Sequence, residues 1–268
     1  MPEGDTVWRT AHRLDGVLAG RELTRCELRV PSLATADLTG RHTLEVVPRG
    51  KHLLTRFEGG LTLHSHLRMD GSWRVFPVGT RPSGGPAHQI RAILGTAAHT
   101  AVGYRLPVLE LLRTTDEERV VGHLGPDLLG PDWDPGEAVA RLLSDPARPL
   151  GDALLDQRNL AGIGNVYKSE LAFLARVTPW LPVGELPRDV PERLVATAHR
   201  LLTANRANSD RRTTAAGART RLHVYGREGR PCLRCGTPVR RSTPAVPGAS
   251  GDERVSYWCP GCQHGPVD

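Results

Sequence analysis

Four of the five cysteines constrain the fold most, because they form two Cys-x-x-Cys pairs near the C-terminus. The pairs are Cys232/Cys235 and Cys259/Cys262, with 23 residues between them. Two knuckles of this spacing give a tetrahedral sulfur cage for zinc, and the intervening segment forms a hairpin. Four thiolates close the coordination sphere, so we expect one structural Zn²⁺ rather than a catalytic metal. The C-terminal segment is therefore predicted to be a small β unit held together by zinc.

The composition indicates a globular, basic protein. The chain has 268 residues, of which 39% are hydrophobic and 24% charged, so neither global disorder nor a fibrous repeat fits. No apolar run is long enough for a membrane span, and the first twenty residues lack a signal-like apolar core. We therefore expect a cytoplasmic protein with no membrane partner. The net charge of +6 favours a polyanionic partner, most often nucleic acid.

The hydrophobic pattern predicts an α+β multidomain chain. A leading amphipathic helix carries Val7, Ala11, Leu14 and Leu18, with Asp5 or Thr6 expected as its cap and Gly20 closing it. Short β-favouring runs broken by glycine and proline follow over 21–123 and predict a β-sandwich. Turn-forming glycines and prolines over 125–135 predict a domain boundary there.

The sequence after this boundary has the apolar spacing of helices. We expect helices at 137–143, 150–159 and 165–176, and a fourth opened by Asp189 and Pro191. The polar segment 206–221, with five arginines, is typical of a mobile or ligand-ordered linker. The expected domains are a β-sandwich at 1–124, a helical domain at 125–222 and a zinc finger at 223–268.

The turn Gly162-Ile163-Gly164 leads directly into one of these helices. Backbone N–H groups at a helix N-terminus, with the amide of Asn165 at the cap, form a seat for a phosphate. Spacing alone favours an ordinary helical hairpin over this interpretation.

Amine groups are scarce, because only Lys51 and Lys168 among the 35 lysines and arginines are lysine. In a chain that uses arginine almost everywhere, these two lysines mark sites where a compact ammonium matters or are retained by chance. Lys168 is interpreted as a solvated helix residue. Removal of Met1 would leave Pro2 as a secondary amine, and an α-amino group has a pKa of about 7.7–8.0, so that a useful fraction is nucleophilic at neutral pH. Glu3 beside it is placed to move protons.

Several motifs occur together in one order. They are Pro2-Glu3-Gly4, Arg49-Gly50-Lys51, His66-Leu67-Arg68-Met69-Asp70-Gly71, Leu124-Gly125-Pro126-Asp127, the Gly162 to Glu170 segment and the four cysteines. With them the chain resembles the formamidopyrimidine-DNA glycosylase/endonuclease VIII family over most of its length. The resemblance implies an N-terminal β-sandwich, a helix-two-turn-helix domain and a C-terminal zinc finger. It further implies a bifunctional DNA glycosylase/AP lyase of base excision repair, acting as a monomer on double-stranded DNA with oxidised bases or abasic sites.

Site roles follow from the same resemblance. Pro2 matches the nucleophile that forms an imine, and Glu3 matches the proton-transferring carboxylate. The DNA-binding positions are Lys51, His66, Met69, Asn165 and Arg254, with Met69 expected to enter the base stack. Strand cleavage by β- and δ-elimination would follow imine formation.

The chain also departs from the family pattern. Thr6 stands where many relatives carry an acidic residue, and Pro244 to Gly251 lengthens the finger hairpin. The arginine-phenylalanine wedge of the oxidised-purine branch is not evident near Gly103-Tyr104-Arg105-Leu106-Pro107, and the chain between Thr214 and Tyr225 is short for a base-capping loop. These absences favour an endonuclease VIII-like enzyme acting on oxidised pyrimidines. The alternatives are an 8-oxoguanine glycosylase of the sister branch, a non-catalytic damaged-DNA-binding zinc protein, and a zinc-ribbon protein that binds structured RNA.

Overall fold

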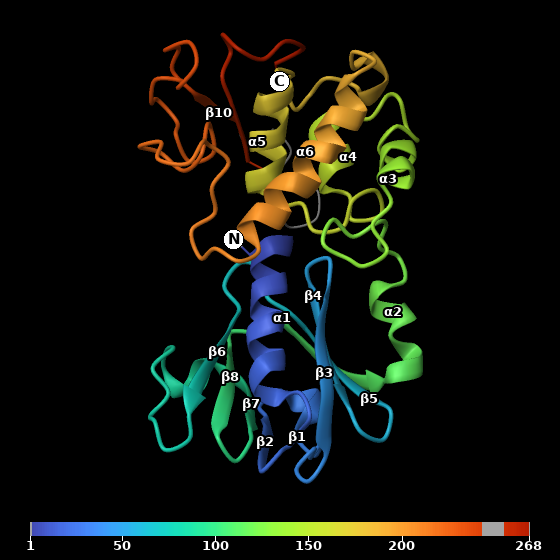
Figure 1. Ribbon diagram of the computed structural model, residues 1–268, viewed down its shortest axis with the longest axis vertical. Helices are drawn as coiled ribbons and strands as arrows, with labels where there is room; N and C mark the ends of the chain where they lie inside the picture. The colour runs from blue at the N-terminus through green and yellow to red at the C-terminus, as the bar shows by residue number, and fades with distance from the viewer. Residues whose placement is uncertain (1, 243–254, 268) are drawn as a thin grey trace. The chain divides into compact units, whose positions relative to one another are not determined.

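The computed structural model describes residues 2–242 and 255–267. It contains two compact units, Met1–His123 and Leu124–Asp268, which are drawn in blue to green and in green to red (Figure 1). No helix in the described part of the chain combines the length and the apolar content needed to cross a bilayer.

Unit 1 is a β-sandwich with a leading helix. The helix α1 (Gly4–Leu18) packs on two antiparallel sheets, one in the order β1-β3-β4-β5-β9 and one in the order β2-β7-β8-β6. The strands are β1 (Arg21–Glu22), β2 (Arg25–Leu28), β3 (His42–Arg49), β4 (His52–Phe57), β5 (Leu61–His66), β6 (Ser72–Pro77), β7 (Ile90–Gly95), β8 (His99–Tyr104) and β9 (Val108–Arg113), and a short helix α2 (Glu118–Val121) follows. The expected β-sandwich is confirmed.

The apolar face of α1 packs into the core as its periodicity predicts. Val7, Ala11, Leu14 and Leu18 are all buried with sheet residues in one core. The expected cap was wrong, because the helix begins at Gly4 and Glu3 occupies the N-cap position in extended backbone. The helix therefore begins two residues after Pro2.

Unit 2 is helical and ends in a small β hairpin. Its elements are α3 (Pro135–Leu142), α4 (Leu150–Leu155), α5 (Asn165–Ala175), α6 (Val190–Asn205), β10 (Arg240–Ser242) and β11 (Ser256–Trp258). The helix expected at 150–159 stops earlier, because the backbone leaves the helical region at Asp156. Hydrogen bonds from Arg158 and Arg148 hold the pKa of the Asp156 carboxyl well below its usual range and tie this exit down.

The segment after α6 forms a closed loop. Asn205 accepts the backbone N–H of Arg212 at 2.8 Å and donates to its carbonyl at 2.8 Å. The guanidinium of Arg212 donates to the carbonyls of Ala215 and Ala218, and the N–H of Thr213 bonds to the carbonyl of Arg221. The expected linker thus has a hydrogen-bonded conformation of its own.

Candidate active site

The N-terminal pair lies at one end of α1. Pro2 is half-buried, and Glu3 is completely buried. The carbonyl of Glu3 accepts the N–H groups of Thr6 and Val7 at 2.9 and 3.0 Å, which fixes the backbone between the carboxyl and the proline nitrogen. An amine beside a carboxyl in this arrangement can combine nucleophilic attack with proton transfer.

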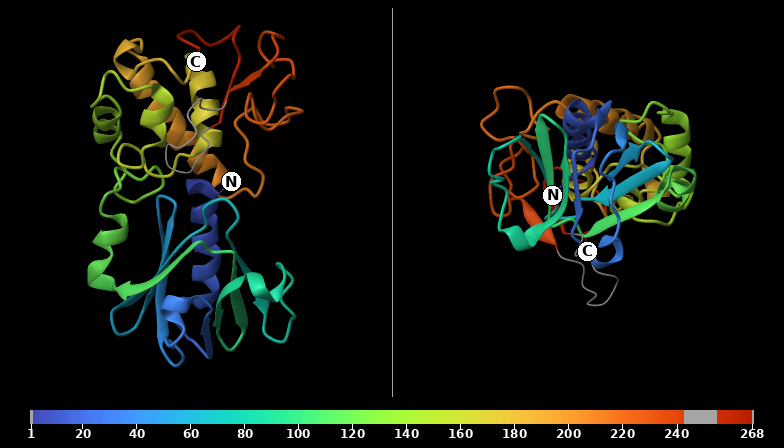
Figure 2. Two further views of the ribbon diagram at one scale, coloured as in Figure 1. Left: turned by 180° about the vertical axis from the view of Figure 1, so that it is seen from behind. Right: turned by 90° about the horizontal axis from the view of Figure 1, so that it is seen from below.

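Strand register brings two further predicted residues together at this end. The Arg49-Gly50-Lys51 turn joins β3 to β4, and it needs glycine because Gly50 has a φ of 57°. In the next ladder His52 pairs with His66, so Lys51 and His66 stand at the same end of the sheet. Both views in Figures 1 and 2 place this end beside the start of α1.

Four histidines gather around this turn. His52 Nδ1 lies 2.8 Å from His64 Nε2, and the His52 ring lies 4.9 Å from the His66 ring and 6.1 Å from the His123 ring. Burial, and then the neighbouring histidines, lower the pKa of His52 to about 3. Burial, and then the charges of Arg68 and Lys51, lower the pKa of His66 to about 4. The rings of His52 and His66 are therefore neutral at physiological pH.

The neutral His66 ring has a defined tautomer. Its Nδ1 accepts the backbone N–H of Arg68 at 2.9 Å, so the ring proton is on Nε2. Arg68 adopts left-handed backbone with a φ of 48°, which turns its N–H toward the ring. Neutral His66 is consequently a hydrogen-bond donor, which suits a phosphate oxygen.

Met69 lies at the tip of the turn between β5 and β6. Met69 is 55% exposed. The N–H of Gly71 closes the turn on the carbonyl of Leu67 at 2.8 Å, and a Cβ on Gly71 would lie 2.5 Å from that oxygen. Arg105 supports the turn from β8 by donating from Nε to the carbonyl of Asp70 at 3.1 Å. The segment where no wedge was evident thus braces the Met69 turn.

Asn165 belongs to unit 2, where it is the first residue of α5 and follows an N-cap at Gly164. The expected cap position is therefore off by one residue. Its side-chain Oδ1 is buried and has no hydrogen-bond partner among the described residues.

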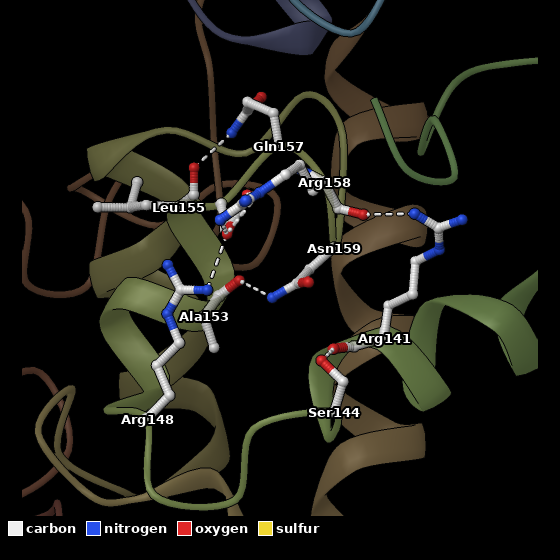
Figure 3. Close-up of polar contacts among 9 residues, drawn as sticks. Arg141, Ser144, Arg148, Ala153, Leu155, Gln157, Arg158 and Asn159 are labelled. Carbon is white, nitrogen blue, oxygen red and sulfur yellow. Dashed lines mark hydrogen bonds and ion pairs between the residues drawn. The ribbon is translucent and has the colours of Figure 1, made fainter. Parts of the chain in front are cut away.

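Gln157 shapes the turn that precedes Asn165. Its side-chain nitrogen donates to the carbonyl of Leu155 at 2.7 Å (Figure 3) and to the carbonyl of Ile163 at 3.1 Å. Its side-chain oxygen accepts the N–H of Gly162 at 3.1 Å. Gly162 has a φ of 109°, which favours glycine. Gln157 therefore holds the glycine turn through its side-chain amide, a role that its position in the sequence does not indicate.

The Leu124-Gly125-Pro126-Asp127 motif packs on the same segment. The N–H of Gly125 donates to the carbonyl of Gln157 at 2.9 Å, and a Cβ on Gly125 would lie 2.1 Å from the carbonyl of Arg158. The N–H of Ala161 bonds to the carbonyl of Pro126 at 3.0 Å. The motif therefore positions the glycine turn through backbone contacts.

The four paired cysteines come together in unit 2. Their sulfur atoms all lie within 4.8 Å of one another, with 3.8 Å between Cys232 and Cys262 and 3.5 Å between Cys235 and Cys259. Tetrahedral coordination with Zn–S bonds of about 2.3 Å separates sulfur atoms by about 3.8 Å, so the donor set fits such an ion. The cluster can hold a metal ion, and Cys26 is not part of it.

Two predictions about basic residues have different outcomes. Lys168 was expected to be solvated, and this was wrong, because only 2% of it is exposed. Arg254 and the hairpin insert Pro244 to Gly251 lie outside the described residues.

The predicted site residues are divided between the two units. Unit 1 contains Pro2, Glu3, Lys51, His66 and Met69, whereas unit 2 contains Asn165 and the four paired cysteines.

Sequence reasoning missed the histidines around His66 and the role of Glu170. His52, His64 and His66 are readable in the sequence, but their grouping depends on strand register. Glu170 is completely buried, and it accepts backbone N–H groups from His223, Val224 and Tyr225.

Comparison with known proteins finds a family domain that matches each of the two units. The Formamidopyrimidine-DNA glycosylase N-terminal domain matches residues 1–124, and the Formamidopyrimidine-DNA glycosylase H2TH domain matches residues 124–214. Probable endonuclease 8 2 of Streptomyces coelicolor is 68% identical over 267 residues, which is 100% of this chain and 95% of that protein. DNA-(apurinic or apyrimidinic site) lyase Nei2 of Mycolicibacterium smegmatis is 48% identical over 264 residues, covering 98% of this chain and 99% of that protein.

A solved structure has the same fold. Lactococcus lactis Fpg in complex with abasic-site DNA superimposes with a TM-score of 0.80 at 23% identity, covering 98% of this chain and 100% of that chain. Together with the family models and the relatives, this establishes the identity of the fold and of the family. The chain belongs to the formamidopyrimidine-DNA glycosylase/endonuclease VIII family of DNA glycosylases and abasic-site lyases, in its endonuclease VIII-like branch.

Proposed function

We propose that this protein excises oxidised pyrimidines from double-stranded DNA with the secondary amine of Pro2 as nucleophile, and then cleaves the strand. The observation that carries the proposal is that Pro2 and the buried Glu3 lead into α1, whose start lies at the same end of unit 1 as the turn between β3 and β4. Strand register puts the end of β5 at this turn. An amine, a carboxyl and phosphate-binding donors are the groups that this chemistry needs.

The proposed reaction uses each group once. The Pro2 nitrogen attacks C1′ of the flipped nucleotide and forms a C–N bond, while the bond from C1′ to the base breaks. The base leaves with the proton that the Pro2 nitrogen gives up. Glu3 delivers a proton to the ring oxygen, which opens the sugar to an iminium. Loss of a C2′ proton then expels the 3′ phosphate by β-elimination, and δ-elimination expels the 5′ phosphate.

The DNA contacts in this proposal come from both units. Lys51 and the Nε2–H of His66 bind phosphates from unit 1, and Asn165 and Arg254 bind phosphates from unit 2. Support for Asn165 comes from its place as the first residue of α5, because the N-terminus of a helix favours an anion such as a phosphate. Met69 fills the space in the stack when the nucleotide flips, and its 55% exposure supports this role.

We assign one structural zinc ion to Cys232, Cys235, Cys259 and Cys262. When bound, this ion supplies folding free energy to the finger and takes no part in the reaction. The proposed division of labour is a catalytic domain at 1–124, a helix-two-turn-helix domain at 125–222 and the finger at 223–268. A monomer acting on the bacterial-type nucleoid in the cytoplasm is the form we propose.

The pyrimidine preference is supported by the short closed loop after α6. Arg212 draws this loop together through its bonds to Ala215 and Ala218, which leaves little chain to cover a large base. Selectivity would then depend on how easily a lesion unstacks and on a pyrimidine-sized space.

Borohydride trapping tests the nucleophile. The chain offers three amines, which are the N-terminus, Lys51 and Lys168. Lys168 is buried, and its ammonium donates hydrogen bonds to Val255 and Ser256. We expect covalent trapping on abasic DNA by the protein that begins at Pro2, loss of trapping when one residue is retained before Pro2, and retained trapping by Lys51→Met at saturating enzyme. Full-rate trapping by the extended protein together with loss in Lys51→Met would reassign the nucleophile to Lys51.

Single-turnover rates test the lesion class. On matched duplexes we expect faster excision of 5-hydroxyuracil and thymine glycol than of 8-oxoguanine, with abasic sites cleaved at least as fast because no base must be recognised. Preference for 8-oxoguanine opposite cytosine would move the protein to the sister branch. Binding without any trapping would identify a non-catalytic damaged-DNA-binding protein.

A further inference from the structure

Three histidines and one glutamate lie close together on one face of the five-stranded sheet. Strand register places His52 of β4 opposite His66 of β5, and His64 of β5 opposite Glu110 of β9. Alternate residues of a strand share a face, so all four side chains belong to the same face. His52 Nδ1 lies 2.8 Å from His64 Nε2, and His64 Nδ1 lies 3.5 Å from Glu110 Oε2.

The surroundings of His64 show which of its ring nitrogens has the proton. Burial lowers the pKa of His64, so the ring is neutral at physiological pH and has one proton. Its Nδ1 is buried and makes no hydrogen bond within the described residues, although the Glu110 carboxylate is 3.5 Å away. A bare Nδ1 would turn a lone pair toward this negative charge, whereas an N–H is attracted to it. The proton is therefore on Nδ1, and Nε2 is an acceptor.

The proton of His52 follows from that of His64. Because His64 Nε2 is an acceptor, His52 donates to it from Nδ1 across 2.8 Å. The His52 ring is neutral, since its pKa is about 3, and its Nε2 consequently has no proton. Glu110, His64 and His52 thus form a chain in which each N–H points to one defined acceptor. Such a chain fixes the orientation of its last ring, which is His52.

The His52 ring packs edge-to-face against His66. The two ring centroids are 4.9 Å apart, and the planes meet at 78°. This arrangement is favourable, because the positive edge of one ring meets the negative face of the other. The backbone N–H of Arg68 holds His66 at Nδ1, so His66 is held by the backbone and by the His52 ring.

We propose that His52 is a positioning residue for DNA binding, because it holds the His66 ring with its Nε2–H in place for a phosphate oxygen. The inference rests on the proposed phosphate contact of His66. Apolar side chains would fill the same space without the cost of burying polar rings. The matched donors and acceptors from Glu110 to His52 therefore indicate that the orientation of the rings matters, and not only their packing.

Imidazole ¹⁵N NMR tests the protons that this chain requires. The full-length wild-type protein is labelled with ¹⁵N-histidine, loaded with zinc and assigned with single-histidine variants. We expect the proton on Nδ1 of His52 and of His64, and on Nε2 of His66. A proton on Nε2 of His52 or of His64 would overturn the inference. This measurement is made on wild type, so its result does not depend on the stability of any variant.

Double-mutant cycles with abasic-site analogue DNA test the link from His52 to His66. Kd is measured for wild type, His52→Ala, His66→Ala and the double variant, and again with Lys51→Met in place of His66→Ala. We expect His52→Ala to raise Kd about fivefold in the wild-type background and less than twofold in the His66→Ala background. In the Lys51→Met background the full rise should persist, because His52 acts through His66.

His42 of β3 provides a matched control in the same sheet. Its Nδ1 also lies 3.5 Å from a carboxylate oxygen, Oε2 of Glu58. His42→Ala should leave Kd within about twofold of wild type, since exposed pairs of this kind contribute little. A rise as large as that of His52→Ala would mean that loss of any histidine from this sheet weakens binding, and the inference would fail.

The cycles also separate a failure of the inference from a failure of the proposed function. Additive losses in His52→Ala and His66→Ala would show that His52 acts independently of His66. Loss of the His52→Ala effect in the Lys51→Met background would show that the substitution disturbs the whole turn. Either result overturns the inference, as does wild-type Kd in His52→Ala beside weak binding in His66→Ala. Wild-type Kd in His66→Ala would instead remove the proposed phosphate contact itself.

His52→Phe covers the case in which His52→Ala does not fold. Phenylalanine keeps an aromatic ring against His66 but has no donor for His64 Nε2. Its Kd should rise by a smaller factor than in His52→Ala, and this rise should also disappear in the His66→Ala background. Wild-type Kd in His52→Phe would show that an aromatic ring is sufficient without the chain to Glu110, which would overturn the inference.

Discussion

Glu170 offers the sharpest test of how the finger is attached to helix α5. Its carboxylate is completely buried, with Oε1 accepting the N–H groups of Val224 and Tyr225 and Oε2 accepting the N–H of His223 and the hydroxyl of Thr213. The substitution Glu170→Ala removes every one of these acceptors. The backbone at 223–225 would then keep three donors without their acceptor.

The expected cost follows from these three donors. A buried donor left without an acceptor costs about 1–3 kcal/mol, so three predict a loss of about 3–6 kcal/mol, with the upper end limited because this backbone can open to water. Glu170→Gln keeps the oxygen that serves Val224 and Tyr225 and loses the one that serves His223, so its cost should be about 1–3 kcal/mol. The pair of variants therefore separates one lost acceptor from three.

Native-state hydrogen exchange at 223–225 measures this local free energy, since the two units need not unfold together. We expect protection of Val224 to fall by at least a hundredfold in Glu170→Ala and by about tenfold in Glu170→Gln, at about 1.4 kcal/mol per tenfold. Zinc content should be unchanged in both. Protection in Glu170→Ala within tenfold of wild type would refute the reasoning that these bonds anchor the segment.

Four further predictions concern the histidines, the Met69 turn and the cysteine cluster. Because burial and nearby positive charge lower the pKa of His66 to about 4, the ratio of Kd between His66→Ala and wild type should stay constant from pH 8 to pH 5.5, and a ratio that rises toward acid would mean that the charged ring binds. With the pKa of His52 also lowered, to about 3, unfolding free energy should be retained above an unfolded-state pKa of about 6.5 and lost as pH falls toward 4, as followed by urea titration at each pH. Gly71→Ala should slow excision with little change in Tm, because its Cβ would lie 2.5 Å from a backbone oxygen of the Met69 turn, whereas Gly16→Ala on α1 meets nothing within 4 Å and should leave the rate unchanged. Cys259→Ser should lose bound zinc by elemental analysis and weaken DNA binding while unit 1 keeps its thermal transition, and normal affinity without zinc would contradict it.

Much of the local structure could be predicted, because it depends on residues close together in the chain. The face of α1 followed from the spacing of Val7, Ala11 and Leu14, since a 3.6-residue period places them on one side. The end of α4 could not be predicted in this way, because Asp156 leaves the helix to bind arginines at positions 148 and 158. The helix ends there because of these ion pairs, which residue-by-residue helix propensities do not include.

The site residues also divide into those that local motifs indicated and those that depend on contacts between distant parts of the chain. The order of the motifs indicated the family, and the comparisons confirm it. The roles of Pro2 and Glu3 stay predictions, as does that of Arg254. The histidine cluster was missed because β4 and β5 bring His52 opposite His66 only through their register.

The sequence by itself determined the donor set for a metal, because two Cys-x-x-Cys pairs contain all four sulfur ligands whatever surrounds them. It also determined the buried face of α1, since helical periodicity is a local property. Only the tertiary structure decided the state of Lys168, which lies in a helix whose neighbours alone suggest a solvated position. Its partners stand 87 and 88 residues further along the chain, and folding brings the start of β11 to the ammonium and excludes water from it. Burial and hydrogen bonding over such separations depend on packing, and packing is not a property of any local stretch of sequence.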